Sequence, residues 1–280
     1  MKDLGAGFQA RPGRSRGVIV IAIVILGIFL ARGVRRDTPN GGEQPASEGK
    51  YTPSGDEGLG AAVAIVIDNS GSMEDMARGD SRPKYQVARE AVAHMLAATD
   101  SFATTQPEFP IKVGLYHFAT DVTRAVDILP YDRTALRDAL SSMPPPNGGT
   151  AIGDALDAAR LDLYKAGVIR KYILVITDGE NTEGRSPELV AREIARRSEG
   201  AVRMYFVAFD VDADKFSFVR DVRGEVLGAG NALALRASLD TIYRGKILAE
   251  AMDAGERLTL PADTSRSKRI TSDSTRAKRP

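Results

Sequence analysis

The chain has 280 residues and a formal net charge of +1, with 38 Lys and Arg residues against 37 Asp and Glu residues. Hydrophobic residues make up 43% of the chain, which excludes a wholly disordered or collagen-like protein. There is no cysteine, so disulfide scaffolds, Cys-ligated zinc sites and thiol nucleophiles are also excluded.

The net charge divides unevenly along the chain. Residues 1–55 hold an excess of basic residues that amounts to +4, residues 56–255 stand at −7, and residues 256–280 return to +4. An acidic central part without a nucleic-acid-reading motif argues against nucleic acid as a partner.

An unbroken apolar run, Val18–Ala31, lies between arginines near the N-terminus. As a helix it spans about 21 Å, and extension over residues 17–34 brings it near 27 Å, close to the roughly 30 Å of a hydrocarbon core. A cleaved signal peptide is the competing interpretation, because Ala31-Arg32-Gly33 loosely resembles a cleavage site. The flanking arginines favour an uncleaved signal anchor, with basic residues 1–16 in the cytoplasm. This arrangement predicts a single-pass membrane protein whose domain lies outside the cytoplasm.

Three further segments follow the predicted anchor. Residues 35–58 are rich in Gly, Pro, Ser and Glu and are predicted to form a flexible linker. Residues 255–280 form a polar basic tail that is predicted to be disordered. Binding to an anionic lipid surface is a second possible role for this tail. Residues 59–254, between them, are predicted to fold as one domain.

Within that domain, predicted strands alternate with predicted helices. The strands are expected at Ala61–Ile67, Ile111–Phe118, Val122–Val126, Tyr172–Thr177 and Val202–Phe209. The helices are expected at Lys84–Ala98, Arg133–Leu140, Ile152–Tyr164, Pro187–Ser198, Lys215–Asp221 and Leu239–Met252. The alternation predicts an α/β fold with a doubly wound, mostly parallel sheet that carries helices on both faces.

Three loops of this predicted fold carry oxygen-bearing side chains. The first strand ends in the turn Asp68-Asn69-Ser70-Gly71-Ser72, the segment Gly148-Gly149-Thr150 precedes a helix, and Thr177-Asp178-Gly179 follows a buried strand. The carboxyl ends of the strands form the ligand crevice of a doubly wound sheet, so we expect five side chains to meet there. They are Asp68, Ser70, Ser72, Thr150 and Asp178. Their oxygens suit a hard cation, Mg²⁺ first, with Mn²⁺ or Ca²⁺ possible.

These motifs resemble the metal-ion-dependent adhesion site (MIDAS) of von Willebrand factor A (VWA) domains. The family pattern is D-x-S-x-S with a distant Thr and a distant Asp, and the chain supplies DNSGS at 68–72, GGTAIGDAL at 148–156 and ITDGEN at 176–181. The resemblance covers about residues 59–254 and implies a Rossmann-like sheet with one antiparallel edge strand, which Val122–Val126 would supply. A single VWA domain behind a signal anchor is also weakly similar to the bacterial Bat-type proteins, which implies the bacterial inner membrane as the location of the anchor.

The resemblance implies a binding protein rather than an enzyme. In the family the cation keeps one open position, which a Glu or Asp of a protein partner fills. Only two of the five ligating side chains are carboxylates, so the metal stays electrophilic and can accept a third from outside. Asn69, Met73, Gly149 and Glu180 are expected on the rim that meets this partner.

Other functions for the same residues remain open at this point. A metal-dependent phosphatase or hydrolase would use the same Asp, Ser and Thr side chains, with Glu180 or Glu74 as its base. Thr150 could also cap the helix that follows it, a role compatible with metal binding. Asp210, Asp212 and Asp214 resemble the start of an EF-hand loop, but Lys215 stands where that loop needs glycine.

Overall fold

The computed structural model describes residues 57–251. The predicted signal anchor at 17–34, nearly all of the predicted linker and the basic tail lie outside these residues. Within residues 57–251, no helix combines the length and the apolar character that a membrane span requires.

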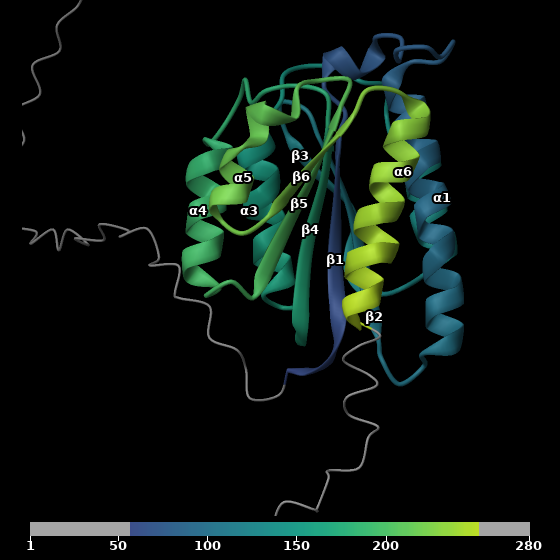
Figure 1. Ribbon diagram of the computed structural model, residues 1–280, viewed down its shortest axis with the longest axis vertical. Coiled ribbons are helices and arrows are strands. Elements are labelled where there is room, and N and C mark those ends of the chain that lie inside the picture. Colours follow the sequence, from purple (N-terminus) through teal and green to yellow (C-terminus); the bar gives the residue numbers. More distant parts are fainter. Residues whose placement is uncertain (1–56, 252–280) are drawn as a thin grey trace, which may run out of the picture. The chain divides into compact units, whose positions relative to one another are not determined.

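A single six-stranded sheet forms the centre of the described part, between two layers of helices (Figure 1). Its strand order is β3-β2-β1-β4-β5-β6. Its strands are β1 (Gly58–Asp68), β2 (Ile111–Phe118), β3 (Val122–Pro130), β4 (Val168–Thr177), β5 (Val202–Phe209) and β6 (Glu225–Ala229). Strand β3 runs antiparallel to β2 at one edge, and the other neighbouring strands are parallel. The predicted doubly wound sheet with one antiparallel edge strand is therefore confirmed.

The central strand β1 shows why its sequence is a continuous apolar run. Residues 61–68 are at most 1% exposed, and successive side chains enter the two different cores on either side of the sheet. A strand buried on both faces has no solvent side and hence no polar alternation. The edge strand β3, in contrast, consists of half-buried and exposed residues.

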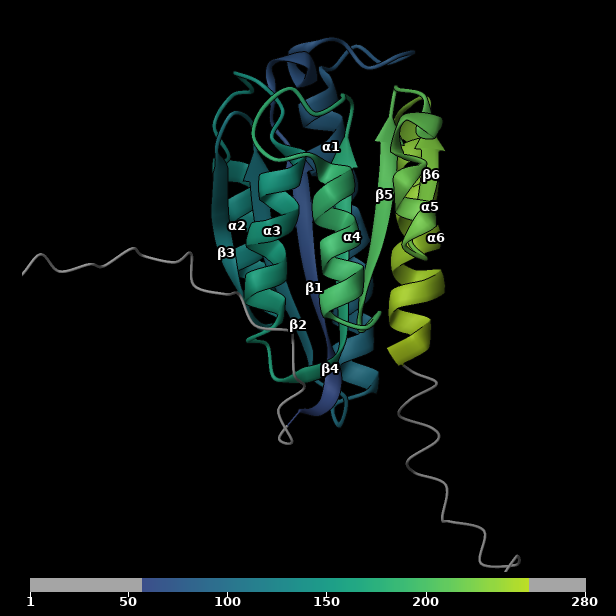
Figure 2. The same cartoon turned by 90° about the vertical axis from the view of Figure 1, so that its left-hand side faces the viewer.

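Helices cover both faces of the sheet, as Figures 1 and 2 show. One face carries α1 (Lys84–Thr105), α2 (Arg133–Ser142) and α6 (Ala232–Ile242), which continues into a π-helical stretch at Tyr243–Leu248. The other face carries α3 (Ile152–Leu163), α4 (Pro187–Arg197) and the short α5 (Phe218–Asp221). Ser186 caps the N-terminus of α4, since its Oγ accepts a hydrogen bond from the backbone N–H of Leu189 at 3.4 Å.

The differences from the sequence prediction are concentrated near the C-terminal end of the domain. Strand β6 was not predicted, and α6 begins at Ala232 rather than at Leu239, after an N-cap at Asn231. The helix expected over Lys215–Asp221 is instead a 3₁₀ turn at Ala213–Phe216 followed by α5.

The register of the sheet places the ends of three strands at the same level. Asp68 is the last residue of β1 and lies opposite Phe118, the last residue of β2. Its predecessor Ile67 pairs with Ile176, which directly precedes the end of β4. Loops that leave these strands therefore start side by side at the carboxyl edge of the sheet.

Candidate metal centre

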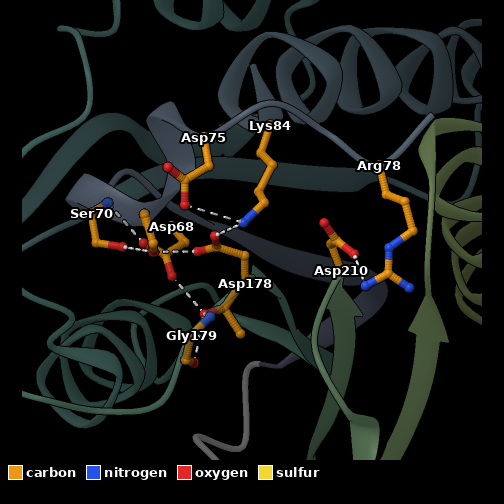
Figure 3. Close-up of polar contacts among 10 residues, drawn as sticks. Asp68, Ser70, Asp75, Arg78, Lys84, Asp178, Gly179 and Asp210 are labelled. Atoms are coloured by element: carbon orange, nitrogen blue, oxygen red, sulfur yellow. Dashed lines mark hydrogen bonds and ion pairs between the residues drawn. The ribbon is translucent and has the colours of Figure 1, made fainter. Parts of the chain in front are cut away.

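The end of β1 and the turn after it bring three predicted ligands together, and Figure 3 shows two of them, Asp68 and Ser70. Asp68 Oδ1 accepts a hydrogen bond from the backbone N–H of Ser70 at 2.8 Å, which fixes the start of the turn. Ser72 lies in the 3₁₀ turn Gly71–Glu74, and its Oγ is 3.2 Å from Ser70 Oγ. The alternate residues of this segment thus direct a carboxylate and two hydroxyls to the same place.

Asp178, directly after β4, joins this group. Its Oδ1 accepts a hydrogen bond from Ser72 Oγ at 2.8 Å, and its side chain is completely buried. The bond links two loops whose residues are 106 positions apart in the sequence.

Thr150 reaches the same place from the third loop. A Cβ built on Gly179 would lie 3.7 Å from Ser72 Oγ and 3.8 Å from Thr150 Oγ1, so both hydroxyls face this glycine. The loop after β4 holds the backbone of Thr150, because Thr150 N–H donates to Thr182 Oγ1 at 2.9 Å and Thr150 O accepts from Thr182 N–H at 2.9 Å. Thr150 is not the N-cap of α3, a position that Ala151 occupies. The five predicted side chains therefore lie together.

Asp68 is the most deeply placed charge of the group. It is fully buried, and its Oδ2 accepts a hydrogen bond from Thr177 Oγ1 at 2.6 Å. Burial raises the pKa of Asp68 from 3.8 to about 6, and the nearby Asp178 adds to this rise, while the hydrogen bonds from Ser70 and Thr177 oppose it. Among residues 57–251 no Lys, Arg or His forms an ion pair with Asp68, so a bound dication would supply the positive charge that compensates it.

The raised pKa of Asp68 predicts how the metal-free domain responds to pH. Between pH 7 and 5 the folded state takes up a proton at Asp68 while the unfolded state, with a pKa near 3.8, does not. The contribution of Asp68 to the free energy of unfolding should therefore rise by about 1 kcal/mol as the pH falls across this window, and fall again as the pH rises through 6. Urea unfolding in EDTA gives the free energy of unfolding of the wild type and of Asp68→Asn at each pH. The difference between the two isolates Asp68, because the other titrating groups contribute equally to both proteins. A difference independent of pH would contradict the prediction.

Lys84, at the start of α1, is a member of the centre that the sequence analysis missed. Its Nζ lies 2.9 Å from Asp178 Oδ2 and 3.8 Å from Asp75 Oδ2 (Figure 3). The lysine side chain is only 11% exposed. The helix dipole disfavours a basic residue in the first turn of a helix. The position of Lys84 at the predicted start of a helix was therefore a sequence signal that this lysine has a partner elsewhere in the fold.

Two of the four expected rim residues are below the surface rather than on it. Met73 is 0% exposed and packs in the hydrophobic core, and Asn69 is 2% exposed. The Asn69 side chain instead connects the turn after β1 to the loop at Pro144 and to α1. Its Nδ2 donates a hydrogen bond to Pro144 O at 3.2 Å, and its Oδ1 accepts one from Arg89 at 3.2 Å. In this conformation neither side chain can meet a partner.

The other two expected rim residues are accessible. Gly149 is half-buried. The Glu180 side chain is 64% exposed and forms an ion pair with Lys215, whose Nζ lies 2.6 Å from Glu180 Oε1. The Glu180 carboxylate is thus paired with the Lys215 ammonium, which does not favour it as the base of a hydrolase.

The donor set of the centre fits a hard divalent cation. It offers two carboxylates and three hydroxyls, all oxygen ligands of the kind that Mg²⁺, Mn²⁺ and Ca²⁺ accept. Across residues 57–251 no three His, Cys, Asp or Glu side chains gather as a metal-binding cluster. A cation at this edge would consequently depend on the serine and threonine hydroxyls as well as on the two aspartates.

The EF-hand-like segment after β5 is organised differently. Asp212 Oδ1 accepts a hydrogen bond from the backbone N–H of Asp214 at 3.0 Å and caps the 3₁₀ turn that follows. Asp210 forms an ion pair with Arg78 at 3.0 Å, as Figure 3 shows beside the centre.

Comparison with known protein families identifies the fold. The von Willebrand factor type A domain matches residues 62–224, more than half of the chain. The chain belongs to the VWA family. A comparison with curated proteins gives no significant match.

Solved VWA structures and related proteins are similar at low sequence identity. The PilB minor pilin from Streptococcus sanguinis is 16% identical, with a TM-score of 0.57 over 72% of this chain and 64% of the pilin, so this VWA chain spans less than two thirds of the pilin's length. The SpRpn10 VWA domain is 17% identical, with a TM-score of 0.52 over 66% of this chain and 95% of that domain. BatB from Bacteroides thetaiotaomicron is 20% identical, with a TM-score of 0.49 over 71% of this chain and all of BatB, a superposition too loose to bear on the Bat resemblance. At these identities the likeness concerns the fold alone.

Proposed function

We propose that this VWA domain binds a divalent cation, Mg²⁺ first, and uses it to recognise an acidic residue of a protein partner. VWA domains generally mediate protein–protein interaction. The observation that carries the proposal is the convergence of Asp68, Ser70, Ser72, Thr150 and Asp178 from three loops at the carboxyl edge of the sheet. These residues would hold the cation, which would supply an electrophilic centre for a carboxylate.

The charge of the centre supports a carboxylate as the group that is recognised. Two aspartates balance the dication, and the hydroxyls of the three other side chains add no charge. The rest of the domain is acidic, and Glu74, Asp75 and Glu180 are exposed near the centre. An acidic partner is therefore attracted by the cation and repelled by its surroundings, so binding should require the metal.

The proposal includes the setting of the domain. The apolar run at 17–34 would anchor the protein in the inner membrane of a bacterium, and the linker would present the domain outside the cytoplasm. Adhesion or the assembly of a complex at the membrane is the role that such a tethered binding domain would serve.

Removal of one hydroxyl ligand tests the cation site directly. Thr150→Ala should weaken Mg²⁺ binding at least tenfold, because it deletes a neutral oxygen ligand and leaves both aspartates in place. Isothermal titration calorimetry with MgCl₂ on the purified full chain gives the affinity. Thr104→Ala is the matched control, since the Thr104 hydroxyl is exposed and bonds to Asp100 O in its own helix.

Capture of partners tests the second half of the proposal. Proteins retained by the immobilised wild type in Mg²⁺ should be released by EDTA and should not be retained by the Thr150→Ala variant. Retention that persists in EDTA would exclude a metal-bridged carboxylate. The absence of a calorimetric Mg²⁺ signal in the wild type would exclude the cation site itself.

A further inference from the structure

We propose that Lys84 is a built-in counter-ion of the metal centre. In the metal-free protein, its ammonium supplies positive charge next to Asp178, so the side chains of the centre are already in position before a metal binds. The same charge makes the centre bind the metal less tightly than it would without the lysine. The inference rests on the proposed cation site and assigns a residue outside the five-residue MIDAS pattern to the control of its affinity.

The geometry divides Asp178 between two partners. Its Oδ1 accepts the hydrogen bond from Ser72 Oγ at 2.8 Å, on the side of the hydroxyl ligands. Its Oδ2 receives the Lys84 ammonium at 2.9 Å, on the side of α1. Lys84 thus holds the carboxylate in one orientation and leaves Oδ1 toward the place where a cation would be bound.

Burial makes this ion pair energetically important. The Asp178 side chain is 0% exposed and the Lys84 side chain 11% exposed, so water screens the pair poorly. Its second acidic neighbour, Asp75, is 3.8 Å away and 74% exposed. Lys84 is therefore committed mainly to Asp178, and its positive charge is fixed next to the centre.

Two consequences follow from a fixed positive charge beside Asp178. In the metal-free protein it compensates a buried carboxylate, which would otherwise destabilise the loop. A dication held by Asp178 would be repelled by the ammonium, because both cations would interact with the same carboxylate. The centre should accordingly load only at a higher free Mg²⁺ concentration than a centre without the lysine.

The test replaces Lys84 by methionine, which has a similar length and no charge. Calorimetric titration of the full chain with MgCl₂ should show about tenfold tighter binding for Lys84→Met than for the wild type. The melting temperature of Lys84→Met in EDTA should be lower than that of the wild type, and its increase on addition of Mg²⁺ should be larger. A merely structural lysine would give lower stability together with weaker Mg²⁺ binding.

The control removes a lysine that is more exposed. Lys215→Met deletes the same charge from a side chain that is 43% exposed and pairs with Glu180, so it should change the Mg²⁺ affinity by less than about twofold. Lys84→Gln, which keeps a hydrogen-bond donor but no charge, should act in the same direction as Lys84→Met. A Lys84→Met protein that folds only with Mg²⁺ would support the proposal.

The outcomes separate this inference from the function on which it rests. If the wild type gives no Mg²⁺ signal, the cation site is wrong and the inference fails with it. If the wild type binds Mg²⁺ and both Lys84 variants bind it equally or more weakly, the role of Lys84 as a counter-ion is overturned while the cation site stands.

Discussion

Asp178→Asn should destabilise the metal-free domain by on the order of 3 kcal/mol, whereas Asp68→Asn should leave its stability unchanged or higher at pH 7.5. Both substitutions remove one carboxylate charge from the same centre. The Asp178 carboxylate is the counter-charge of the buried Lys84, at 2.9 Å, and its loss leaves the ammonium, among residues 57–251, with only the longer ion pair to Asp75, at 3.8 Å, whose side chain is 74% exposed. The Asp68 carboxylate has no cation within its hydrogen-bond set, and burial already disfavours its charged form.

The asparagine at position 68 also fits its neighbours. Its side-chain oxygen can accept from the Ser70 N–H, and its amide can donate to Thr177 Oγ1, whose hydroxyl also bonds to Gly179 O at 3.2 Å. Asp68→Asn should nonetheless lose Mg²⁺ binding, because it removes a charged ligand.

Urea unfolding in EDTA measures both variants, and the double variant Lys84→Met/Asp178→Asn is the decisive control. Removing both charges of the buried pair should restore most of the stability that Asp178→Asn loses, since no unpaired charge remains. The double variant should still bind Mg²⁺ more weakly than the wild type, because it lacks the Asp178 carboxylate. Equal destabilisation by Asp68→Asn and Asp178→Asn would show that the ion pair does not stabilise the centre.

Gly153→Ala should destabilise the domain by about 3 kcal/mol and weaken Mg²⁺ binding at least tenfold, although Gly153 is not a ligand. A Cβ at this position in α3 would lie 2.0 Å from the backbone oxygen of Arg185, so the backbone must move. Arg185 belongs to the loop after β4 that also contains Thr182, which holds the backbone of Thr150. Displacing that loop displaces Thr150.

Gly245→Ala is the matched control for Gly153→Ala. Gly245 also lies in a helical segment, but nothing comes within 4 Å of its added Cβ, so the substitution should change stability by less than about 1 kcal/mol and leave Mg²⁺ binding unchanged. Thermal melts and MgCl₂ titrations of both variants give the comparison. If Gly153→Ala loses stability and keeps its Mg²⁺ affinity, the α3–loop contact supports the fold without setting the position of Thr150.

The sequence predicts the fold, and the convergence of the five candidate residues at one edge of the sheet, for a physical reason. Strands buried on both faces appear as continuous apolar runs, and the carboxyl ends of parallel strands must meet at one edge. The residues at and directly after the ends of β1 and β4 are therefore placed by topology alone, without knowledge of side-chain packing. Asp68 and Asp178 are of this kind.

What the sequence could not predict depends on long-range packing. Lys84 meets Asp178 across 94 positions, and no local pattern joins the two residues. Asn69 lies within the DNSGS motif and Met73 directly follows it, yet their burial depends on the core below and on the Pro144 loop. Strand β6 is short and contains Gly228, so its sequence carries a weak strand signal, and its pairing with β5 defines it.

The position of Asp68 at one end of β1 has a mechanical consequence. The described chain enters the sheet at the opposite end of this strand, and β1 pairs in parallel with β2 on one side and β4 on the other. A load applied between residue 57 and the metal centre would pull along the strand axis. The hydrogen bonds on both sides of β1 would then be sheared together rather than opened one after another, so the strand that carries the first ligand is well placed to resist tension.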